Sequence, residues 1–416
     1  MRILPILMAI VINLIACAEE KPEGDYPVID LIGHIEKYQR AYCSDYFSSI
    51  ELIPLETRDE CLLPNAPFPR IILKDDYIFM RGEHLNAFDI SGKFLYKIGR
   101  IGQGPGEYLS ANIFFSSTDK QAIYVDDVAK ISEYDFKGNY IRSIQKPKIN
   151  NKIIIQISSV GGDMFIGSIH NDGETKYKYF LFNGDGKIVE CFPNHVFFKK
   201  EGEWVGTYHR SLTPFRVEDK LYLKDYVNDT LYVYENSKLK PAYIFEVGKY
   251  SIPIECLEKF EMSRRRSRHF AFNTGLDIVG TPKFFFYNTL VPDIFPCPKT
   301  KPRYNHLVNE YRSTNRSVYG IYDIEKNTNM LLDTDQHHQK GIVNDLNGGL
   351  PVFPRYYAGD NLVVDVWNAE EMKEMLTEEY FEKQTIKDQE GHQKLKKILA
   401  NLKEDDNPVV VVARLK

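Results

Sequence analysis

One short phrase of this chain recurs, and it constrains the fold more than any other feature. An aromatic residue and an Asp or Asn end one apolar strand, a glycine-containing turn follows, and a second strand begins. Copies lie at Ala87–Leu95, Glu133–Ile141 and Leu181–Val189, with a degenerate copy at Ile321–Asn327. A period of roughly 40–50 residues, with every unit made of strands, is typical of a β-propeller. Because one such unit cannot bury its apolar face alone, the repeat predicts a ring of blades that pack on one another.

Apolar segments around these turns divide the chain into six predicted blades. The first five span about residues 71–100, 113–145, 153–192, 213–247 and 283–332, and the sixth begins at 341–343. The fifth blade is stretched by a proline-rich segment at 291–304, so a ring of seven blades is an alternative.

The two ends of the chain are predicted to complete the sixth blade together. Residues 50–55 and 409–413 read as strands, and their pairing would close the ring and remove exposed sheet edges. Helical patterns interrupt the strands at about 251–278 and 368–403. The predicted fold is therefore all-β, a six-bladed β-propeller over residues 48–416 that carries helical insertions.

The N-terminus has the pattern of an export signal. Arg2 precedes an apolar stretch at 3–15, which is too short to span a bilayer and indicates a signal peptide over residues 1–16. The small residue before Cys17 resembles a bacterial lipobox, in which that cysteine is acylated. An ordinary signal peptide with an incidental cysteine is the alternative. On the first interpretation, residues 17–47 form a lipid-anchored tether and lead-in, and the protein lies at the outer membrane, facing the periplasm or the cell surface.

Charge and cysteine content bear on the function and on the covalent structure. The formal net charge is −5, which argues against non-specific nucleic-acid binding because that needs a basic surface. Of the six cysteines, an odd number remains once Cys17 is set aside, so no disulfide pairing can be deduced. Buried thiols are the favoured interpretation of the remaining cysteines.

A glycine-rich loop between the first two predicted blades carries a family resemblance. The loop is Arg100–Tyr108, and it has three glycines and a proline within nine residues. Together with Ile53–Thr57 upstream and Asn407–Val409 near the end, it resembles a family of six-bladed β-propeller lipoproteins of Gram-negative bacteria related to NHL-repeat propellers. The resemblance covers nearly the whole mature chain. It implies the propeller fold and an envelope location, but no chemistry, because the function of that family is not established.

The same loop contains the first set of candidate binding residues. Arg100, Gln103, Glu107 and Tyr108 are polar or aromatic residues on a backbone whose shape is set by glycine. A Walker A ending and a following helix are both absent from the motif, so phosphate cradling is not predicted. One interpretation is that the loop holds one blade against the next, and the other is that it contacts a ligand.

Four carboxylates that end or interrupt apolar strands form the second set of candidates. They are Asp126, Asp127, Asp225 and Asp365. Carboxylates from different blades could meet at one mouth of the central channel and coordinate calcium, which takes six to eight oxygen ligands. The alternative is ordinary turn chemistry, since Asp at a strand end accepts local hydrogen bonds. The sequence contains no HExxH, GxSxG or zinc-ligand spacing, so no catalytic residue, metal site or cofactor is predicted.

These observations lead to three hypotheses about function, the last of which is a purely structural component of the envelope that binds no small ligand. The first is a non-enzymatic binding or scaffold module for a protein, peptide or glycan partner, held to the membrane only through the lipid on Cys17. The second is a metal-dependent propeller enzyme, such as a lactonase-like hydrolase or a lyase, that uses the carboxylates of the channel. The absence of a catalytic motif favours the first hypothesis.

Overall fold

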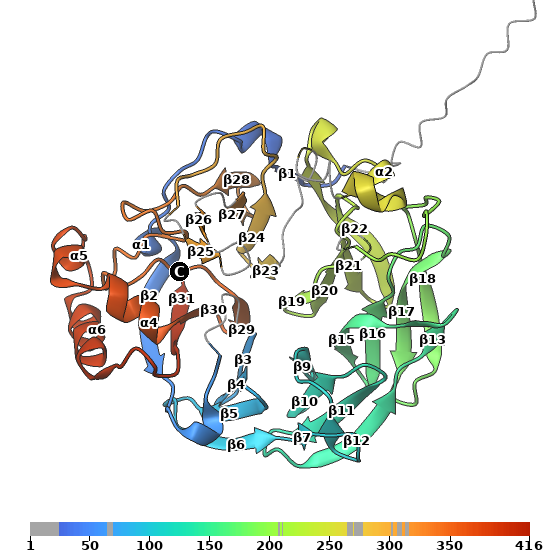
Figure 1. Ribbon diagram of the computed structural model, residues 1–416, viewed down its shortest axis with the longest axis horizontal. Helices are drawn as coiled ribbons and strands as arrows, with labels where there is room; N and C mark the ends of the chain where they lie inside the picture. The colour runs from blue at the N-terminus through green and yellow to red at the C-terminus, as the bar shows by residue number, and fades with distance from the viewer. Residues whose placement is uncertain are drawn as a thin grey trace, which may run out of the picture.

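The protein is a ring of six β-sheets around a central channel, which confirms the predicted six-bladed β-propeller (Figure 1). The computed structural model describes residues 25–64, 70–206, 209, 211–263, 269, 278–300, 303–305, 310–312 and 316–416. Within these residues, five blades are four-stranded sheets and one blade has five strands. The first strand of each blade lies nearest the channel.

The first three blades follow the chain without interruption. Blade 1 contains β3 (Ile71–Lys74), β4 (Tyr77–Arg81), β5 (Leu85–Asp89) and β6 (Phe94–Ile98). Blade 2 contains β9 (Phe114–Ser116), β10 (Ala122–Asp126), β11 (Lys130–Asp135) and β12 (Tyr140–Gln145). Blade 3 contains β15 (Ile155–Gly161), β16 (Met164–Ser168), β17 (Tyr177–Asn183) and β18 (Ile188–Pro193).

The other three blades include segments from distant parts of the chain. Blade 4 contains β19 (Phe215–Val217), β20 (Lys220–Lys224), β21 (Thr230–Glu235) and β22 (Lys238–Glu246), with β1 (Val28–Asp30) on its outer edge. Blade 5 contains β23 (Ile278–Gly280), β24 (Phe284–Leu290), β27 (Ser317–Asp323) and β28 (Thr328–Leu331). Blade 6 contains β29 (Tyr356–Gly359), β30 (Leu362–Trp367), β31 (Val409–Leu415) and β2 (Phe47–Pro54).

The repeated phrase forms the turn between the third and fourth strands of a blade. In blade 1, Asp89 Oδ1 accepts hydrogen bonds from the backbone N–H groups of Ser91 (2.9 Å) and Lys93 (3.0 Å). Asp135 and Asn183 accept the equivalent pair of bonds in blades 2 and 3. A short side-chain acceptor at this position therefore organises the turn, which is why Asp or Asn recurs there.

The ring is closed as predicted, by strands from both ends of the chain. β2 pairs antiparallel with β31, with Ile50 opposite Ala413 and Ile53 opposite Val410. Pro54 lies at the end of β2, the outermost strand of its sheet, where its missing N–H leaves no ladder hydrogen bond unmade. The interior of the sheet is apolar on both faces because blades 5 and 1 cover it.

Aromatic and aliphatic side chains fill the space between neighbouring blades. Phe79 of blade 1 packs with Ile123 and Phe136 of blade 2, and all three are at most 2% exposed. Burying such a side chain stabilises a fold by about 1.5–3 kcal/mol relative to leaving it in water. The blades are therefore held together mainly by their apolar faces.

Two boundaries differ from the prediction. The folded domain begins before residue 48, because β1 pairs in parallel with β22 and Ile29 is fully buried. The sixth blade begins at β29 rather than at 341–343, where only an isolated bridge joins Ile342 to Val352. The apolar run at 341–343 is not a blade strand, because Ile342 is buried by packing in the same cluster as the helical insertion and makes only an isolated bridge.

The two helical insertions differ in size. The second contains α4 (Ala369–Met375), α5 (Glu378–Glu382) and α6 (Gln389–Asn401), while the described part of the first contains α2 (Glu255–Glu258). Shorter elements complete the described chain: α1 (Cys43–Tyr46), η1 (Ile32–His34), η2 (Asp59–Cys61), η4 (Gly248–Tyr250), and the strand pairs β7 (Arg100–Ile101) with β8 (Glu107–Tyr108), β13 (Lys148–Ile149) with β14 (Lys152–Ile153), and β25 (Arg303–Asn305) with β26 (Glu310–Arg312).

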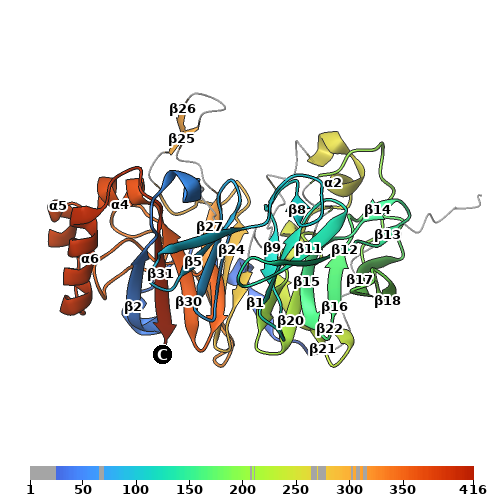
Figure 2. The same ribbon diagram turned by 90° about the horizontal axis from the view of Figure 1, so that it is seen from below.

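The two faces of the ring are unlike each other. Helices α2 and α4 and the β25–β26 hairpin lie along the upper side in Figure 2, and the C-terminus lies on the lower side. We call these the upper and lower faces. The first strand of each blade runs from the upper to the lower face, and the repeated turns lie on the lower face. The hairpin also accounts for the stretched fifth region, which is an insertion and not a seventh blade.

Candidate functional site

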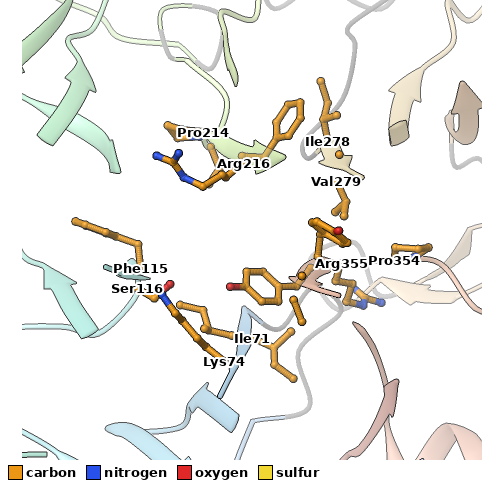
Figure 3. Close-up of a pocket in the computed structure, with 18 of the residues that line it drawn as sticks. Ile71, Lys74, Phe115, Ser116, Pro214, Arg216, Ile278, Val279, Pro354 and Arg355 are labelled. Atoms are coloured by element: carbon orange, nitrogen blue, oxygen red, sulfur yellow. The ribbon is translucent and has the colours of Figure 1, made fainter. Parts of the chain in front are cut away.

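A cavity of about 800 Å³ occupies the central channel. Its walls come mainly from the innermost strands β3, β9, β19, β23 and β29 and from the residues that flank them (Figure 3). Ligand sites for small molecules commonly measure about 300–1,000 Å³ and combine apolar walls with a few polar groups. The cavity is therefore large enough for a small ligand or for part of a larger one.

Aromatic rings form much of the wall. Phe115 stacks on Tyr124 with 5.0 Å between ring centroids, and Phe215 stacks on Tyr222 at 5.1 Å. Both Phe rings line the cavity and both are half-buried, so each is held in place from behind by its neighbour. Tyr356 also lines the cavity, and burial raises its pKa to about 12. These rings present flat apolar surface to whatever enters the channel.

Two cations lie toward the lower end of the cavity. The Lys74 ammonium donates a hydrogen bond to the carbonyl of Ser117 in the neighbouring blade. Arg216 Nη1 donates to the carbonyl of Asp219 at 3.1 Å, and Nη2 donates to the carbonyl of Ser159 at 2.9 Å. Burial lowers the pKa of both side chains. The charge of Arg216 also contributes to the lowered pKa of Lys74, against the opposing charge of Asp75.

The predicted carboxylates Asp126 and Asp365 lie beside the channel but do not line the cavity. Asp126 forms an ion pair of 2.6 Å with Lys146, and the two side chains are 2% and 3% exposed. Burial raises the pKa of Asp126, and the Lys146 charge opposes this rise. Asp365 pairs with Arg355 at 2.6 Å and accepts the backbone N–H of Phe353 at 2.8 Å. Both carboxylates thus have partners within the fold.

Asp225 and Asp127 are engaged in the same way. Asp225 Oδ1 accepts hydrogen bonds from Ser211 Oγ (2.5 Å) and Tyr179 OH (3.2 Å), and lies 3.3 Å from Lys178 Nζ. Asp127 accepts the backbone N–H groups of the residues at 109 and 128, each at 2.8 Å. The structure therefore does not bring the four carboxylates together at the channel, and a calcium-binding role for them stays a prediction.

The glycine-rich loop is tied internally by Glu107. Its two carboxylate oxygens accept hydrogen bonds from Arg100 Nε (2.6 Å) and Gly104 N (2.8 Å). The Gly104 hydrogen bond and the Arg100 interactions lower the pKa of Glu107. Tyr108 is fully buried and donates to the carbonyl of Ile98 at 2.8 Å. Three of the four predicted loop residues thus define the shape of the loop.

The loop also attaches blade 1 to blade 2. Lys130 of blade 2 donates to the Gly104 carbonyl at 3.2 Å, and Tyr134 OH donates to the Gly106 carbonyl at 3.2 Å. Gln103 is exposed at the loop surface. These contacts support the interpretation in which the loop holds one blade against the next, and ligand contact through Gln103 stays a prediction.

Other predicted features have simple placements. Cys17 lies outside the described residues. The five cysteines of the described chain are free thiols, of which Cys43, Cys61 and Cys256 are buried. Among the residues that the structure describes, no helix is long and apolar enough to cross a membrane. Within the same residues, no group of three or more His, Cys, Asp or Glu side chains is arranged to hold a metal ion.

The two cations at the lower end of the cavity were missed by sequence reasoning. Lys74 ends the apolar segment Ile71–Leu73, and Arg216 interrupts the short apolar segment Phe215–Val217. A cation inside the first strand of a blade was the available signal, because that strand faces the channel in a propeller. The signal was weak, since a charge at a strand end is common at any sheet surface.

Comparison with solved structures supports the fold alone. A Bacteroides fragilis protein named as a "Putative exported protein" superposes with a TM-score of 0.64 and 17% identity, covering 94% of this chain and 99% of that one. A member of the DUF4221 family from Bacteroides vulgatus gives a TM-score of 0.45 and 10% identity, over 89% and 97% of the two chains. A protein of unknown function from Bacteroides thetaiotaomicron gives 0.41 and 8%, over 88% and 76%.

No curated protein matches the chain. Residues 26–414 match a protein family over nearly the whole folded domain, from just before β1 into β31. The matched segment includes β1 and the lead-in, in agreement with their packing on the ring. The chain belongs to the family described as Domain of unknown function (DUF4934).

Proposed function

We propose that this protein is an exported, lipid-anchored binding module whose central cavity receives part of a peptide, glycan or protein partner. The observation that carries the proposal is the cavity itself, a space of about 800 Å³ with aromatic walls and polar groups from several blades. Such a combination is typical of sites that bind small molecules. The rigid ring keeps these groups in fixed positions before a ligand arrives.

The envelope location rests on two separate observations. The N-terminal apolar stretch ends at Cys17 in a lipobox-like sequence. The Bacteroides fragilis protein that shares the fold is named as exported. Acylation of Cys17 would hold the ring at a membrane surface through the short polar segment that precedes β1. Two or more acyl chains are needed for such an anchor to be durable.

The cavity proposal is tested by thermal unfolding of a soluble form that begins at Ala18, with panels of peptides and oligosaccharides. A ligand that binds only the folded state stabilises it by about 2.7 kcal/mol at a hundredfold excess over its Kd. Thr118→Trp places a large ring at the exposed lower rim of the cavity and should abolish the stabilisation. Val189→Trp, at a site 59% exposed on the outer strand β18, is the matched control and should preserve it.

Two results would change the assignment. A ligand whose effect survives in Thr118→Trp binds elsewhere, and the cavity proposal is then wrong. Loss of stability in EDTA that one metal restores would instead favour the metal-dependent enzyme. The anchor is tested separately: Cys17→Ala should release the protein from membranes, and a variant that still fractionates with them would refute the lipoprotein assignment.

A further inference from the structure

Two cations reach the lower part of the cavity from opposite walls. Lys74 ends β3 in blade 1 and Arg216 lies on β19 in blade 4, and these two blades stand opposite each other in the ring (Figures 1 and 3). Both side chains line the cavity and both are half-buried. Like charges that approach in a partly desolvated space repel each other more strongly than they would in bulk water.

The pairing of these two cations differs from that of three other cations that are withdrawn from water. Lys146, Lys178 and Arg355 each lie 2.6–3.3 Å from a carboxylate oxygen. Within the described part of the chain, no carboxylate oxygen lies within 4.0 Å of Lys74 Nζ or of the Arg216 guanidinium. Their hydrogen bonds go to backbone carbonyls. The charges of Asp75 and Asp119 favour the charged form of Lys74, and that of Asp219 favours the charged form of Arg216, but none of these carboxylates forms a close ion pair with the cation.

The carboxylates near these cations are directed to other partners or to solvent. Asp75 accepts a hydrogen bond from the Gln121 side chain at 2.9 Å, and Asp119 accepts the backbone N–H of Gly162 at 2.8 Å. Glu218, Asp219 and Asp360 are exposed at the lower rim, where water and salt screen their charges. Retaining two half-buried cations without close ion pairs is unfavourable for the empty fold, which points to a counterion supplied from outside.

We infer that the ligand of this cavity carries an oxyanion, a carboxylate, sulfate or phosphate group, which binds between Lys74 Nζ and the guanidinium of Arg216. The inference rests on the proposed function, because it names the chemistry that the proposed cavity recognises. The half-buried rings of Phe115, on β9, and Phe215, on β19, line the same cavity and would contact the apolar part of such a ligand. Charge-assisted hydrogen bonds from ammonium and guanidinium groups are the strongest that side chains make to an oxyanion.

The test uses simple oxyanions as probes. Binding of sulfate, phosphate and acetate to the soluble form is measured by calorimetry and thermal unfolding, against sodium chloride at equal ionic strength. Lys74→Gln and Arg216→Gln keep an N–H donor for the backbone carbonyls but remove the charge. Each should weaken oxyanion binding by about tenfold or more. Lys93→Gln removes an exposed charge from the same face of the ring and should bind as the wild type does.

A second measurement locates the anion directly. Crystals soaked in selenate should show the anomalous signal of selenium between Lys74 and Arg216, and this signal should vanish in the double variant. The inference is overturned if selenate is absent from the cavity, or if all variants respond to the oxyanions equally. If the oxyanion tests fail but neutral ligands still bind, and Thr118→Trp blocks their binding, the proposed function is retained. Preference among the three probes distinguishes a carboxylate ligand from a sulfated or phosphorylated one.

Lys74→Gln also separates this role from a purely structural one. If Lys74 serves only to bridge two blades, its neutral variant should be less stable with or without an anion. If Lys74 is instead an uncompensated cation of an anion site, the result should depend on the oxyanion. Without oxyanion, the variant should be at least as stable as the wild type. With oxyanion present, the variant should be less stable than the wild type. An equal loss of stability with and without oxyanion would contradict the inference.

Discussion

At the scale of single residues, Gly92 shows how the repeated turn also joins two blades. Gly92 has a φ of +86°, which L side chains rarely adopt, and its backbone is held by the Asp89 turn. A Cβ atom at Gly92 would lie 2.1 Å from the carbonyl oxygen of Pro54, on the outer strand of blade 6. In the same way, a Cβ atom added at Gly186 would lie 2.3 Å from the carbonyl oxygen of Gln145 in blade 2. Glycine is thus required for the turn and for the close approach of the preceding blade.

This predicts a measurable difference between two glycine substitutions. Gly162→Ala changes a residue with φ of +56° and no atom within 4 Å of the added Cβ, so it should show only the backbone cost of about 1–2 kcal/mol. Gly92→Ala adds a steric conflict and should lower the free energy of unfolding by a further 1–3 kcal/mol or so. Urea denaturation measures both values. Equal losses would mean that the contact with Pro54 is not important.

The carboxylates show why sequence alone could not locate a site. A strand-end Asp predicts either a turn or a ligand, and the choice depends on what lies opposite it. The partner of Asp126 is Lys146, which lies after the last strand of the same blade, and the partner of Asp365 is Arg355. Neither pairing can be deduced from spacing, since it follows from how the ends of strands meet on the upper face.

At the scale of secondary-structure elements, Asp345 fastens the lead-in to the helical insertion. Its carboxylate accepts hydrogen bonds from Ser44 N (2.8 Å) and Ser44 Oγ (2.6 Å), at α1, and pairs with Lys387 Nζ at 2.7 Å, just before α6. Burial raises the pKa of Asp345, but the hydrogen bonds from Lys387 and Ser44 outweigh this effect and lower the pKa overall. One side chain thereby holds together three segments that are far apart in the sequence.

The lowered pKa predicts how this contact depends on pH. Because the folded pKa of Asp345 lies below the unfolded value of about 4, its contribution is complete above that value and is lost as pH falls through the folded pKa. Asp345→Asn should reduce the free energy of unfolding by about 1–3 kcal/mol near neutral pH. The difference in the free energy of unfolding between the variant and the wild type should become smaller in acid. Denaturation curves from neutral to acid pH measure it, and a gap that widens in acid would contradict the assignment.

At the scale of the whole molecule, the closed ring has no terminal blade. Repeat folds are stabilised by contacts between neighbours, so an open array loses its end units first. Here β2 and β31 join the ends of the chain in one sheet, and β1 adds to the edge of blade 4. Every blade is therefore covered on both sides, and unfolding should involve all of them together.

The two tryptophans test this cooperativity. Trp367 is on β30 in blade 6, and Trp204 lies in the connection between blades 3 and 4. Trp204→Phe and Trp367→Phe each leave one fluorescent reporter, and the two urea transitions should coincide if the ring unfolds as a unit. Val411→Pro removes an N–H from the middle of β31 and should shift the Trp367 transition to lower urea than the Trp204 transition. Separate transitions without Val411→Pro would refute cooperative closure.

The sequence by itself determined the architecture of this protein. The repeated Asp-turn phrase and the strand period report local properties, and the two terminal strands were matched because a ring must close; all of these were confirmed. The structure alone decided which side chains meet in the channel. Lys74 and Arg216 come from opposite blades of the ring, and the pairing of Asp126 with Lys146 depends on where two strands end in space. The packing of the blades follows from the local pattern of apolar residues and turns. The set of side chains that line the channel follows from the geometry of the closed ring, which the spacing of residues along the chain does not encode.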